Sequence, residues 1–372
     1  MRRTVIHFTD TAGFGGAEQM LLTTLAGLDQ QRWRCVLMHY PGAGTAQLAA
    51  SARDLEIETH PVPRTSSLAA DLAQLARAIR SERAVLMHAH LIGAMRCTRG
   101  MLAARLAGVQ GVIATQQLYP RSLSRRTRMR QRFISILVDR YIAVSHAMAR
   151  TLREALAFRN RIAVIHNAVD LVAFAEKESY RVPDVFTDRE GRPTVLTVAR
   201  LNKQKGLEYL IAAAPYLPGT RFLIAGEGPD REALEMQARA LNVADRVVFL
   251  GQRGDVRDLL AACDVFVLPS LFEGLPVSIL EAMAVGKPVI ATAIGGTDEA
   301  IVHRETGLLV PPADPAGLAS ALQLLLEDSS LRQRIGDAGR ARVRQNFSAE
   351  AMIEQLSGVY HEVLRERHAS AA

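Results

Sequence analysis

Two glutamates within one short stretch could take part in chemistry on a polar ligand. The stretch runs from Leu268 to Gly286 and reads LPSLFEGLPVSILEAMAVG, with seven residues between Glu273 and Glu281. Glu273 lies among glycine and proline residues and is expected in a loop, whereas Glu281 lies in an almost wholly apolar run. An unpaired carboxylate is costly to bury, so the apolar surroundings of Glu281 favour a ligand site. The alternative, in which both glutamates are ordinary solvated surface charges, is about equally supported.

The elements around these acids would place both at one edge of a sheet. The apolar run 265–268 predicts a short buried strand that ends before Glu273. Pro276 suits the first turn of the next helix, which ends near Val285, and Gly286 suits its C-terminal cap. In α/β sheets ligands bind at the carboxyl ends of the strands, and a helix N-terminus attracts anions.

Three basic residues follow another predicted strand, in the sequence VARLNKQKG from Val198 to Gly206. Arg200 and Lys205 are expected at the same sheet edge as Glu273. There an arginine can bind a phosphate through two parallel hydrogen bonds, and a lysine adds a point charge. The alternative is a solvated basic turn, which Lys203 fits best.

Three further turns contain glycines that permit close backbone approach. Gly13–Glu18 reads GFGGAE between the first strand and first helix, where a phosphate site and a plain tight turn are equally supported. Gly226–Asp230 fits a plain turn at least as well as ligand contact. Backbone groups of Gly251–Arg253 could hold a nucleotide base.

The metal-ligating residue types do not form a convincing metal site. His88 and His90 form an HxH pair, but no matching ligand cluster accompanies it, so core or cleft-lining histidines are favoured. Cys35, Cys97 and Cys263 each lie in apolar segments and are expected to be buried, reduced thiols.

Charge is distributed unevenly along the chain. Residues 1–180 carry 24 basic and 13 acidic side chains, whereas the remaining residues carry 21 and 25. A basic first half indicates an anionic partner such as a membrane surface, a phosphorylated ligand or nucleic acid.

The segment from Arg121 to Arg132 contains six arginines and no acid. An apolar stripe crosses the same predicted helix, but Arg126 and Arg130 fall inside or beside it. The segment fits a helix lying on anionic lipid about as well as a solvated basic face, and it lacks the interleaved aromatic residues that would indicate nucleic acid. The stripe consists of Met129, Phe133, Ile136 and Leu137. The arginines are Arg121, Arg125, Arg126, Arg128, Arg130 and Arg132.

The length of 372 residues and the 49% hydrophobic content fit two globular domains. Neither a membrane-spanning helix nor a signal peptide is expected, because no sufficiently long apolar run occurs. Short apolar strands alternate with helices, which predicts parallel sheets covered on both faces. We expect a first domain at 1–170, a linker at 171–193, a second domain at 194–347, and a final helix within 348–372 that crosses back to the first domain. The expected strands are 4–8, 35–39, 85–87, 112–115, 141–144, 162–165, 195–198, 222–225, 247–250, 265–268, 289–292 and 307–310.

The order of these motifs resembles the retaining glycosyltransferases of family 4. The segments that carry the resemblance are GGAE at 15–18, Arg200-x4-Lys205-Gly206, AGEGP at 225–229 and PSxxEGxPxxxxEAMAxGxPV at 269–289, with NAVD at 167–170, GGxxE at 295–299 and GLLV at 307–310. The resemblance is strong from about 162 to 347 and sparser before. It implies the GT-B fold, with two doubly wound Rossmann-like α/β domains that face each other across a cleft. The first domain would bind the acceptor and the second the nucleotide sugar.

The resemblance also implies roles for individual residues. Arg200 and Lys205 would neutralise the donor diphosphate with no metal or other cofactor. Glu273 would bind sugar hydroxyls, and Glu281 the ribose hydroxyls. The remaining donor-binding residues would be Gly16, Gly226, Arg253, Gly274, Leu275 and Pro276.

One departure from the family concerns the residue that faces the reacting sugar. The family often has a histidine after the strand that ends here at Thr115, where this chain has Gln116 and Gln117. We favour Gln117 at that position. Glutamine can donate a hydrogen bond to a sugar hydroxyl but cannot carry a proton, which puts sugar preference and activity in question.

The implied function is hexosyl transfer with retention, from a nucleoside-diphosphate sugar to a lipid-linked or polysaccharide acceptor in cell-surface glycan synthesis. A UDP-sugar is favoured over a GDP-sugar as donor. The alternatives are a nucleotide-sugar epimerase of the same fold and a non-catalytic sugar-nucleotide binder. The expected location is cytoplasmic, with peripheral attachment to the inner face of the cell membrane through the arginine-rich segment. No nucleic-acid partner is expected.

Overall fold

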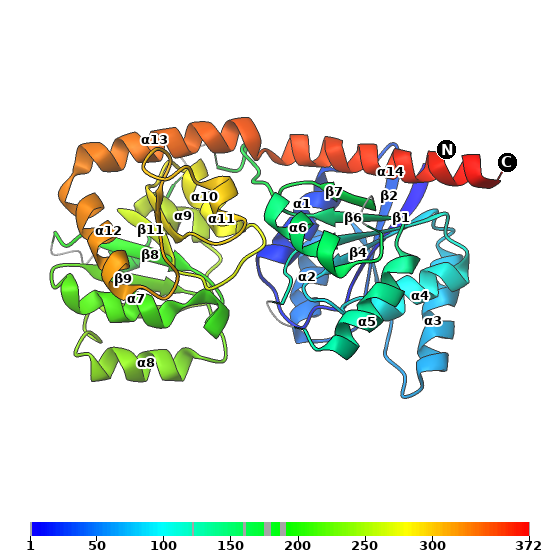
Figure 1. The fold of residues 1–372 in the computed structure, drawn as a ribbon, viewed down its shortest axis with the longest axis horizontal. Helices are drawn as coiled ribbons and strands as arrows, with labels where there is room; N and C mark the ends of the chain where they lie inside the picture. Colours follow the sequence, from blue (N-terminus) through cyan, green and yellow to red (C-terminus); the bar gives the residue numbers. More distant parts are fainter. Residues whose placement is uncertain (1, 121–122, 159–160, 175–179, 187–190, 372) are drawn as a thin grey trace. The chain divides into compact units, whose positions relative to one another are not determined.

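The computed structural model describes residues 2–120, 123–158, 161–174, 180–186 and 191–371. Contacts divide the chain into two compact units, both drawn in Figure 1. One unit combines Met1–Asn167 with Ala349–Ala372, and the other is Ala168–Ser348. Each unit is built on a parallel sheet with helices between successive strands, so the α/β prediction is confirmed. Arg121, the first of the six arginines in the expected membrane-binding segment, lies outside the described residues.

The first unit contains a seven-stranded sheet in the order β3-β2-β1-β4-β5-β6-β7. Strand β4 is buried along its whole length, as expected where both faces of a parallel sheet are covered. The strands are β1 (Arg3–Thr9), β2 (Trp33–His39), β3 (Glu58–Pro61), β4 (Leu86–Leu91), β5 (Gly111–Gln116), β6 (Arg140–Ala143) and β7 (Ile162–Val164). The helices are α1 (Gly16–Gly27), α2 (Ala43–Asp54), α3 (Leu68–Ser81), α4 (Thr98–Ala107), α5 (Arg125–Ile134), η1 (Ser135–Leu137), α6 (His146–Ala155) and α14 (Ala349–Ala371).

The second unit contains a six-stranded sheet in the order β10-β9-β8-β11-β12-β13. Its strand order places β8 beside β11, which brings the residues that follow these two strands to one edge. The strands are β8 (Thr194–Val198), β9 (Arg221–Ala225), β10 (Val247–Gly251), β11 (Val265–Leu268), β12 (Val289–Thr292) and β13 (Leu308–Val310). The helices are η4 (Asp184–Phe186), η5 (Lys203–Lys205), α7 (Leu207–Ala213), η6 (Ala214–Tyr216), α8 (Arg231–Ala240), α9 (Val256–Ala262), α10 (Val277–Ala284), α11 (Thr297–Ala300), α12 (Pro315–Glu327) and α13 (Ser329–Asn346).

Several elements differ from those expected. Helix α2, strand β3 and the short helix α11 were not predicted. Strand β4 extends to Leu91, so His88 and His90 lie inside it rather than after its end. The described part of the expected linker at 171–193 packs on the second unit, because Phe186 is buried there and Arg221 Nη1 donates to the Val185 carbonyl over 3.1 Å.

The last helix joins the first unit although it follows the second in sequence. Helix α14 packs against α1 and β5, and its Tyr360 is fully buried. Tyr360 makes an edge-on contact with Trp33 at the start of β2, with ring centroids 5.3 Å apart. All three cysteines are buried and free, as predicted. Among the described residues, no helix is both long and apolar enough to span a membrane.

Candidate functional site

Glu273 forms the centre of a polar cluster in the second unit. Its Oε1 accepts hydrogen bonds from Lys205 Nζ at 2.5 Å and from Ser270 Oγ at 2.7 Å. Gln204 Nε2 lies 3.3 Å from the other carboxylate oxygen. The Lys205 and Glu273 side chains are only 18% and 6% exposed, so water screens their attraction weakly. The structure therefore brings together Lys205 and Glu273, two of the residues that the family resemblance assigns to the reacting donor.

Gly206 allows the basic turn to approach the Glu273 loop. Its φ of +61° lies in the left-handed region, and a Cβ there would meet the Pro269 carbonyl oxygen at 2.2 Å. Two hydrogen bonds tie the same segments together: Leu271 N donates to the Gln204 carbonyl over 2.7 Å, and Gln204 Nε2 donates to the Phe272 carbonyl over 3.1 Å. Only glycine fits this contact without displacing a backbone.

The Gly274-Leu275-Pro276 segment is held by a second glycine contact. A Cβ on Gly296, whose φ is +92°, would lie 1.7 Å from the Gly274 carbonyl oxygen. Pro276 is the N-cap residue of α10, and Leu275 is 2% exposed. The segment therefore leads into a helix N-terminus with its backbone fixed, an arrangement that suits an anionic ligand.

Glu281 on α10 is a partly buried carboxylate that lacks a partner. Among the described residues, nothing donates a hydrogen bond to it or forms an ion pair with it. Burial raises its pKa from 4.5 to about 7. Such a carboxylate can accept hydrogen bonds from ligand hydroxyls without first breaking an internal contact.

The other donor-site candidates of the second unit differ in how available they are. Arg200 follows β8 and is exposed, with no ion-pair partner within the described part of the chain. Arg253 makes a two-point ion pair with Asp255, at 2.8 and 2.5 Å, so its guanidinium is already occupied. Gly226 has a packing role, because a Cβ there would lie 2.0 Å from the Ala199 carbonyl oxygen.

Gln117 and Gly16 belong to the first unit. Asn167 Nδ2 donates to Gln117 Oε1 over 2.9 Å, which leaves the Gln117 amide hydrogens without a partner among the described residues. Gln117 lines a cavity at the carboxyl ends of β4 to β7, whereas Gln116 is fully buried and donates to the Leu118 carbonyl. Gly16 is the first residue of α1, directly after the N-cap Gly15.

Three buried histidines cluster at this cavity. His7 on β1 pairs in register with His88 on β4, and His7 Nδ1 lies 3.1 Å from His90 Nε2. His88 has hydrogen-bond partners at both nitrogens, Tyr360 OH and Thr115 Oγ1, each at 2.7 Å. Burial lowers the pKa of all three histidines, that of His90 to about 3. His88 and His90 line the cavity, as one of the two favoured interpretations expected.

Two family models match successive parts of the chain. Glycosyltransferase Family 4 matches residues 14–172, and Glycosyl transferases group 1 matches residues 182–342. The chain belongs to glycosyltransferase family 4. The resemblance seen in its motifs is thereby confirmed.

Curated relatives of this family 4 glycosyltransferase match it over part of their length. The N-acetyl-alpha-D-glucosaminyl L-malate synthase of Bacillus anthracis is 29% identical over 231 residues, 61% of each chain. The lipopolysaccharide core biosynthesis glycosyltransferase LpsE of Rhizobium meliloti is 38% identical over 162 residues, 44% of this chain and 48% of that protein. The matches to these two proteins and to two further curated relatives span between 47% and 61% of those proteins' length.

Solved structures show that the fold is GT-B. Anabaena Alr3699/HepE in complex with UDP and glucose aligns with a TM-score of 0.87 and 21% identity, over 97% of this chain and 100% of that one. A glycosyltransferase from Rickettsia africae ESF-5 aligns with a TM-score of 0.82 and 20% identity, over 98% and 99%. The expected fold class is therefore confirmed.

Sequence reasoning missed several partners of the predicted site residues. Ser270 and Gln204 contact Glu273, and Asn167 orients Gln117. Ser270 precedes Glu273 by three residues and Gln204 precedes Lys205 directly, so proximity in sequence could have identified both. The Asn167–Gln117 contact joins residues 50 apart and has no local signal.

Proposed function

We propose that this protein transfers a hexose from a nucleoside-diphosphate sugar, with retention of configuration, to a lipid-linked or polysaccharide acceptor. The proposal depends most on Glu281, a partly buried carboxylate that has no partner among the described residues. Glu281 lies on α10, the helix that follows the Lys205–Glu273 pair. Ribose hydroxyls would supply the hydrogen bonds that Glu281 lacks.

The second unit supplies the charges that donor binding requires. Arg200 is exposed and without an ion-pair partner in the described chain, so its guanidinium can bind a diphosphate. Lys205 would add a second positive charge, and Glu273 would exchange part of its contact with Lys205 for sugar hydroxyls. These two cations would stabilise the leaving diphosphate, so the proposal needs no metal or other cofactor.

UDP is the favoured nucleotide. The structural neighbour HepE is described in complexes with UDP and with UDP-glucose, and its fold match extends over nearly the whole chain. Gly274, Leu275, Pro276 and Gly226 would line the donor through their backbone, as would Gly16 from the first unit. Arg253 would contribute backbone groups only, because Asp255 holds its side chain.

The first unit would position the reacting sugar and the acceptor. Gln117 would donate a hydrogen bond from its amide to a sugar hydroxyl, with Asn167 fixing the amide orientation. A glutamine at this position binds without transferring a proton. The lipopolysaccharide relative LpsE supports an acceptor in cell-surface glycan synthesis.

Helix α5 supports attachment to a cytoplasmic membrane face. Its apolar side chains Met129 and Phe133, followed by Ile136, are 60%, 68% and 53% exposed instead of packed in the core. The exposed arginines of the same helix would pair with anionic lipid headgroups. We name this set the α5 surface. It consists of Arg125, Arg126, Arg128, Met129, Arg130, Arg132, Phe133 and Ile136.

A thermal-shift panel of nucleoside diphosphates and their sugars tests the donor proposal. A ligand at a hundred times its dissociation constant adds about 2.7 kcal/mol of stability. We expect UDP and one UDP-sugar to stabilise the protein, and Glu281→Ala and Arg200→Ala to abolish the effect. Matched controls are Glu232→Ala and Lys203→Ala, which remove exposed charges of the same unit.

A product assay then separates transfer from the alternatives. Transfer of labelled sugar to a glycan or lipid acceptor with an unchanged anomeric configuration supports the proposal. Conversion of the donor sugar without acceptor would establish an epimerase, and donor binding without turnover would establish a non-catalytic binder. Absence of nucleotide binding would overturn the proposal as a whole.

A further inference from the structure

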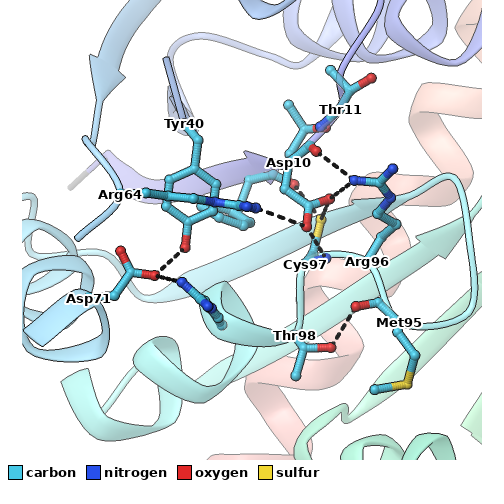
Figure 2. A network of polar contacts seen from close by, with 12 residues as sticks. Asp10, Thr11, Tyr40, Arg64, Asp71, Met95, Arg96, Cys97 and Thr98 are labelled. Atoms are coloured by element: carbon cyan, nitrogen blue, oxygen red, sulfur yellow. Dashed lines mark hydrogen bonds and ion pairs between the residues drawn. The ribbon is translucent and has the colours of Figure 1, made fainter. Parts of the chain in front are cut away.

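Two arginines converge on one carboxylate at the carboxyl edge of the first unit's sheet. Asp10 directly follows β1, Arg64 lies between β3 and α3, and Arg96 lies between β4 and α4. Figure 2 shows both guanidinium groups pointing toward Asp10 from different loops. The Arg64 and Arg96 side chains are 54% and 43% exposed, whereas that of Asp10 is 13% exposed. The two guanidinium groups are therefore accessible to solvent, whereas the Asp10 carboxylate is largely buried.

Asp10 does not saturate either arginine. The closest guanidinium nitrogens of Arg64 and Arg96 lie 4.0 Å from its carboxylate, beyond hydrogen-bond distance. The carboxylate instead accepts a hydrogen bond from Cys97 N at 3.0 Å, which fixes the start of α4. Among the described residues, neither guanidinium donates a hydrogen bond to a carboxylate. One acid thus faces two arginines whose donors are largely available.

A neighbouring arginine shows what a satisfied pair looks like here. Arg99 Nη1 donates to Asp71 Oδ2 over 2.7 Å, and Tyr40 OH donates to the same oxygen over 3.0 Å. The Asp71 side chain is fully buried. Figure 2 shows Asp71 and its Tyr40 partner close to the arginines around Asp10. An arginine and a carboxylate therefore reach hydrogen-bond distance elsewhere in this region, so the 4.0 Å separations are particular to Asp10.

Arg64 is also held in position before any ligand arrives. Its guanidinium carbon lies 4.3 Å from the centroid of the Tyr40 ring, and the Tyr40 hydroxyl is anchored on Asp71. Stacking on an aromatic face leaves the N–H donors at the guanidinium edge free to bind an anion in its plane. Arg96 is held by a 3.2 Å hydrogen bond from Nη1 to the Asp10 carbonyl. The two side chains are therefore pre-organised for one ligand.

The glycine turn of the first unit borders the arginine pair. Gly13, the first residue of this turn, follows Asp10 by three residues. The turn is closely packed, because a Cβ on Gly44 would meet Gly13 N at 2.4 Å. The Thr11 hydroxyl donates to the Gly13 carbonyl over 3.0 Å. The arginine pair thus lies within the first unit next to the turn that precedes α1.

We propose that Arg64 and Arg96 bind a phosphate group carried by the acceptor. Two guanidinium groups at one point match the charge and the several acceptor oxygens of a phosphate ester. Binding of the phosphate would break few existing contacts, because the phosphate would use guanidinium N–H donors that Asp10 leaves available. This inference rests on the proposed glycosyl transfer and specifies its acceptor as a phosphorylated molecule.

Calorimetric titration of the 372-residue protein tests the proposal with two probes, inorganic phosphate and farnesyl phosphate. Saturating UDP is present throughout, so that a probe cannot report on the donor diphosphate site. We expect the wild type to bind the probes, and Arg64→Gln and Arg96→Gln each to weaken binding about tenfold. The control Arg77→Gln/Arg150→Gln removes two exposed arginines of the same unit and should bind like the wild type.

The charge-conserving variants Arg64→Lys and Arg96→Lys guard against a folding artefact, because they keep the charge and lose only the forked geometry. They should bind more weakly than the wild type and more tightly than the glutamine variants. Tighter binding of farnesyl phosphate supports the proposal with a lipid-linked source, and equal binding supports it with a soluble one. Equal binding by the wild type and the double Arg64→Gln/Arg96→Gln variant, or no binding by either, would overturn it. UDP-induced stabilisation, measured on the same samples, reports on the donor proposal independently.

Discussion

Lys205 Nζ lies 2.5 Å from Glu273 Oε1, and this pair joins η5 to the loop after β11 although the two residues are 68 positions apart in sequence. Both side chains are largely buried, so each neutralises a charge that would be costly alone. The pair holds the basic turn after β8 against the loop after β11. In the proposed donor site, the pair would supply a cation for the diphosphate and a carboxylate for the sugar hydroxyls.

Breaking this pair from either side should destabilise the protein. Lys205→Met and Glu273→Gln should each lower the free energy of unfolding by about 2–4 kcal/mol, because a charge or a polar partner is left buried. The double variant should cost less than the two together, with a coupling energy of about 1–3 kcal/mol. Urea unfolding of all four proteins measures this cycle. Strict additivity would show that the two side chains do not interact in solution.

Replacing Glu281 should change how stability depends on pH. Its folded pKa is about 7 against 4.5 unperturbed, so between these values the folded state keeps a proton that the unfolded state has lost. Wild-type stability therefore falls as pH rises from about 5 to 7. Glu281→Gln lacks this term and should gain up to about 3 kcal/mol relative to the wild type over that range. Unfolding curves at several pH values test this, and parallel profiles for the two proteins would contradict it.

Gly206 should tolerate no side chain. Gly206→Ala forces a left-handed conformation on alanine and sets its Cβ 2.2 Å from the Pro269 carbonyl oxygen. We expect a loss of at least about 2 kcal/mol and weaker UDP binding, because the Lys205 turn must move. Gly219→Ala is the matched control, since a Cβ there meets nothing within 4 Å. Similar melting temperatures for the two variants would refute the packing role.

Gln117 and Asn167 should act on turnover rather than on nucleotide binding. Gln117→Ala removes the amide, and Asn167→Ala removes the group that orients it through a 2.9 Å hydrogen bond. We expect kcat to fall about tenfold to a hundredfold in the first variant and less in the second, with UDP affinity unchanged in both. Steady-state kinetics with a UDP-sugar provides the measurement. A drop in UDP affinity without a drop in kcat would place Gln117 outside the reacting centre.

The α5 surface should bind anionic membranes. Met129→Ser/Phe133→Ser removes two exposed apolar side chains and should weaken binding to phosphatidylglycerol vesicles about tenfold or more. Met236→Ser/Leu324→Ser, which changes exposed apolar residues of the second unit, should have no effect. Sedimentation with vesicles at low and high salt measures this, and salt should weaken the wild-type interaction. Equal binding to uncharged phosphatidylcholine would argue against the arginines.

The alternation of apolar strands with helices was sufficient to predict two parallel-sheet units and most of their elements. Strand β3 and helix α2 escaped prediction for a physical reason. β3 is an edge strand with half-exposed side chains, so it lacks the continuous apolar run of a central strand. Helix α2 is rich in small residues, which leaves only a weak amphipathic pattern.

Chain order and local periodicity fix where each strand stops, so the residues that follow the strands could be predicted from the amino-acid sequence. It thereby identified Glu273, Glu281, Arg200 and Lys205 as one candidate set. Their contacts, in contrast, depend on the folded chain: Lys205 and Glu273 are paired, and Glu281 lacks a partner among the described residues.

The same distinction holds in the first unit. An apolar stripe on α5 was visible in the sequence, but only packing shows that Gln131 is buried while Met129 and Phe133 are exposed. Asp10, Arg64 and Arg96 gave no signal together, because they come from loops far apart in the chain. Periodicity reports on neighbours along one element, whereas such contacts depend on which strands lie side by side in the sheet.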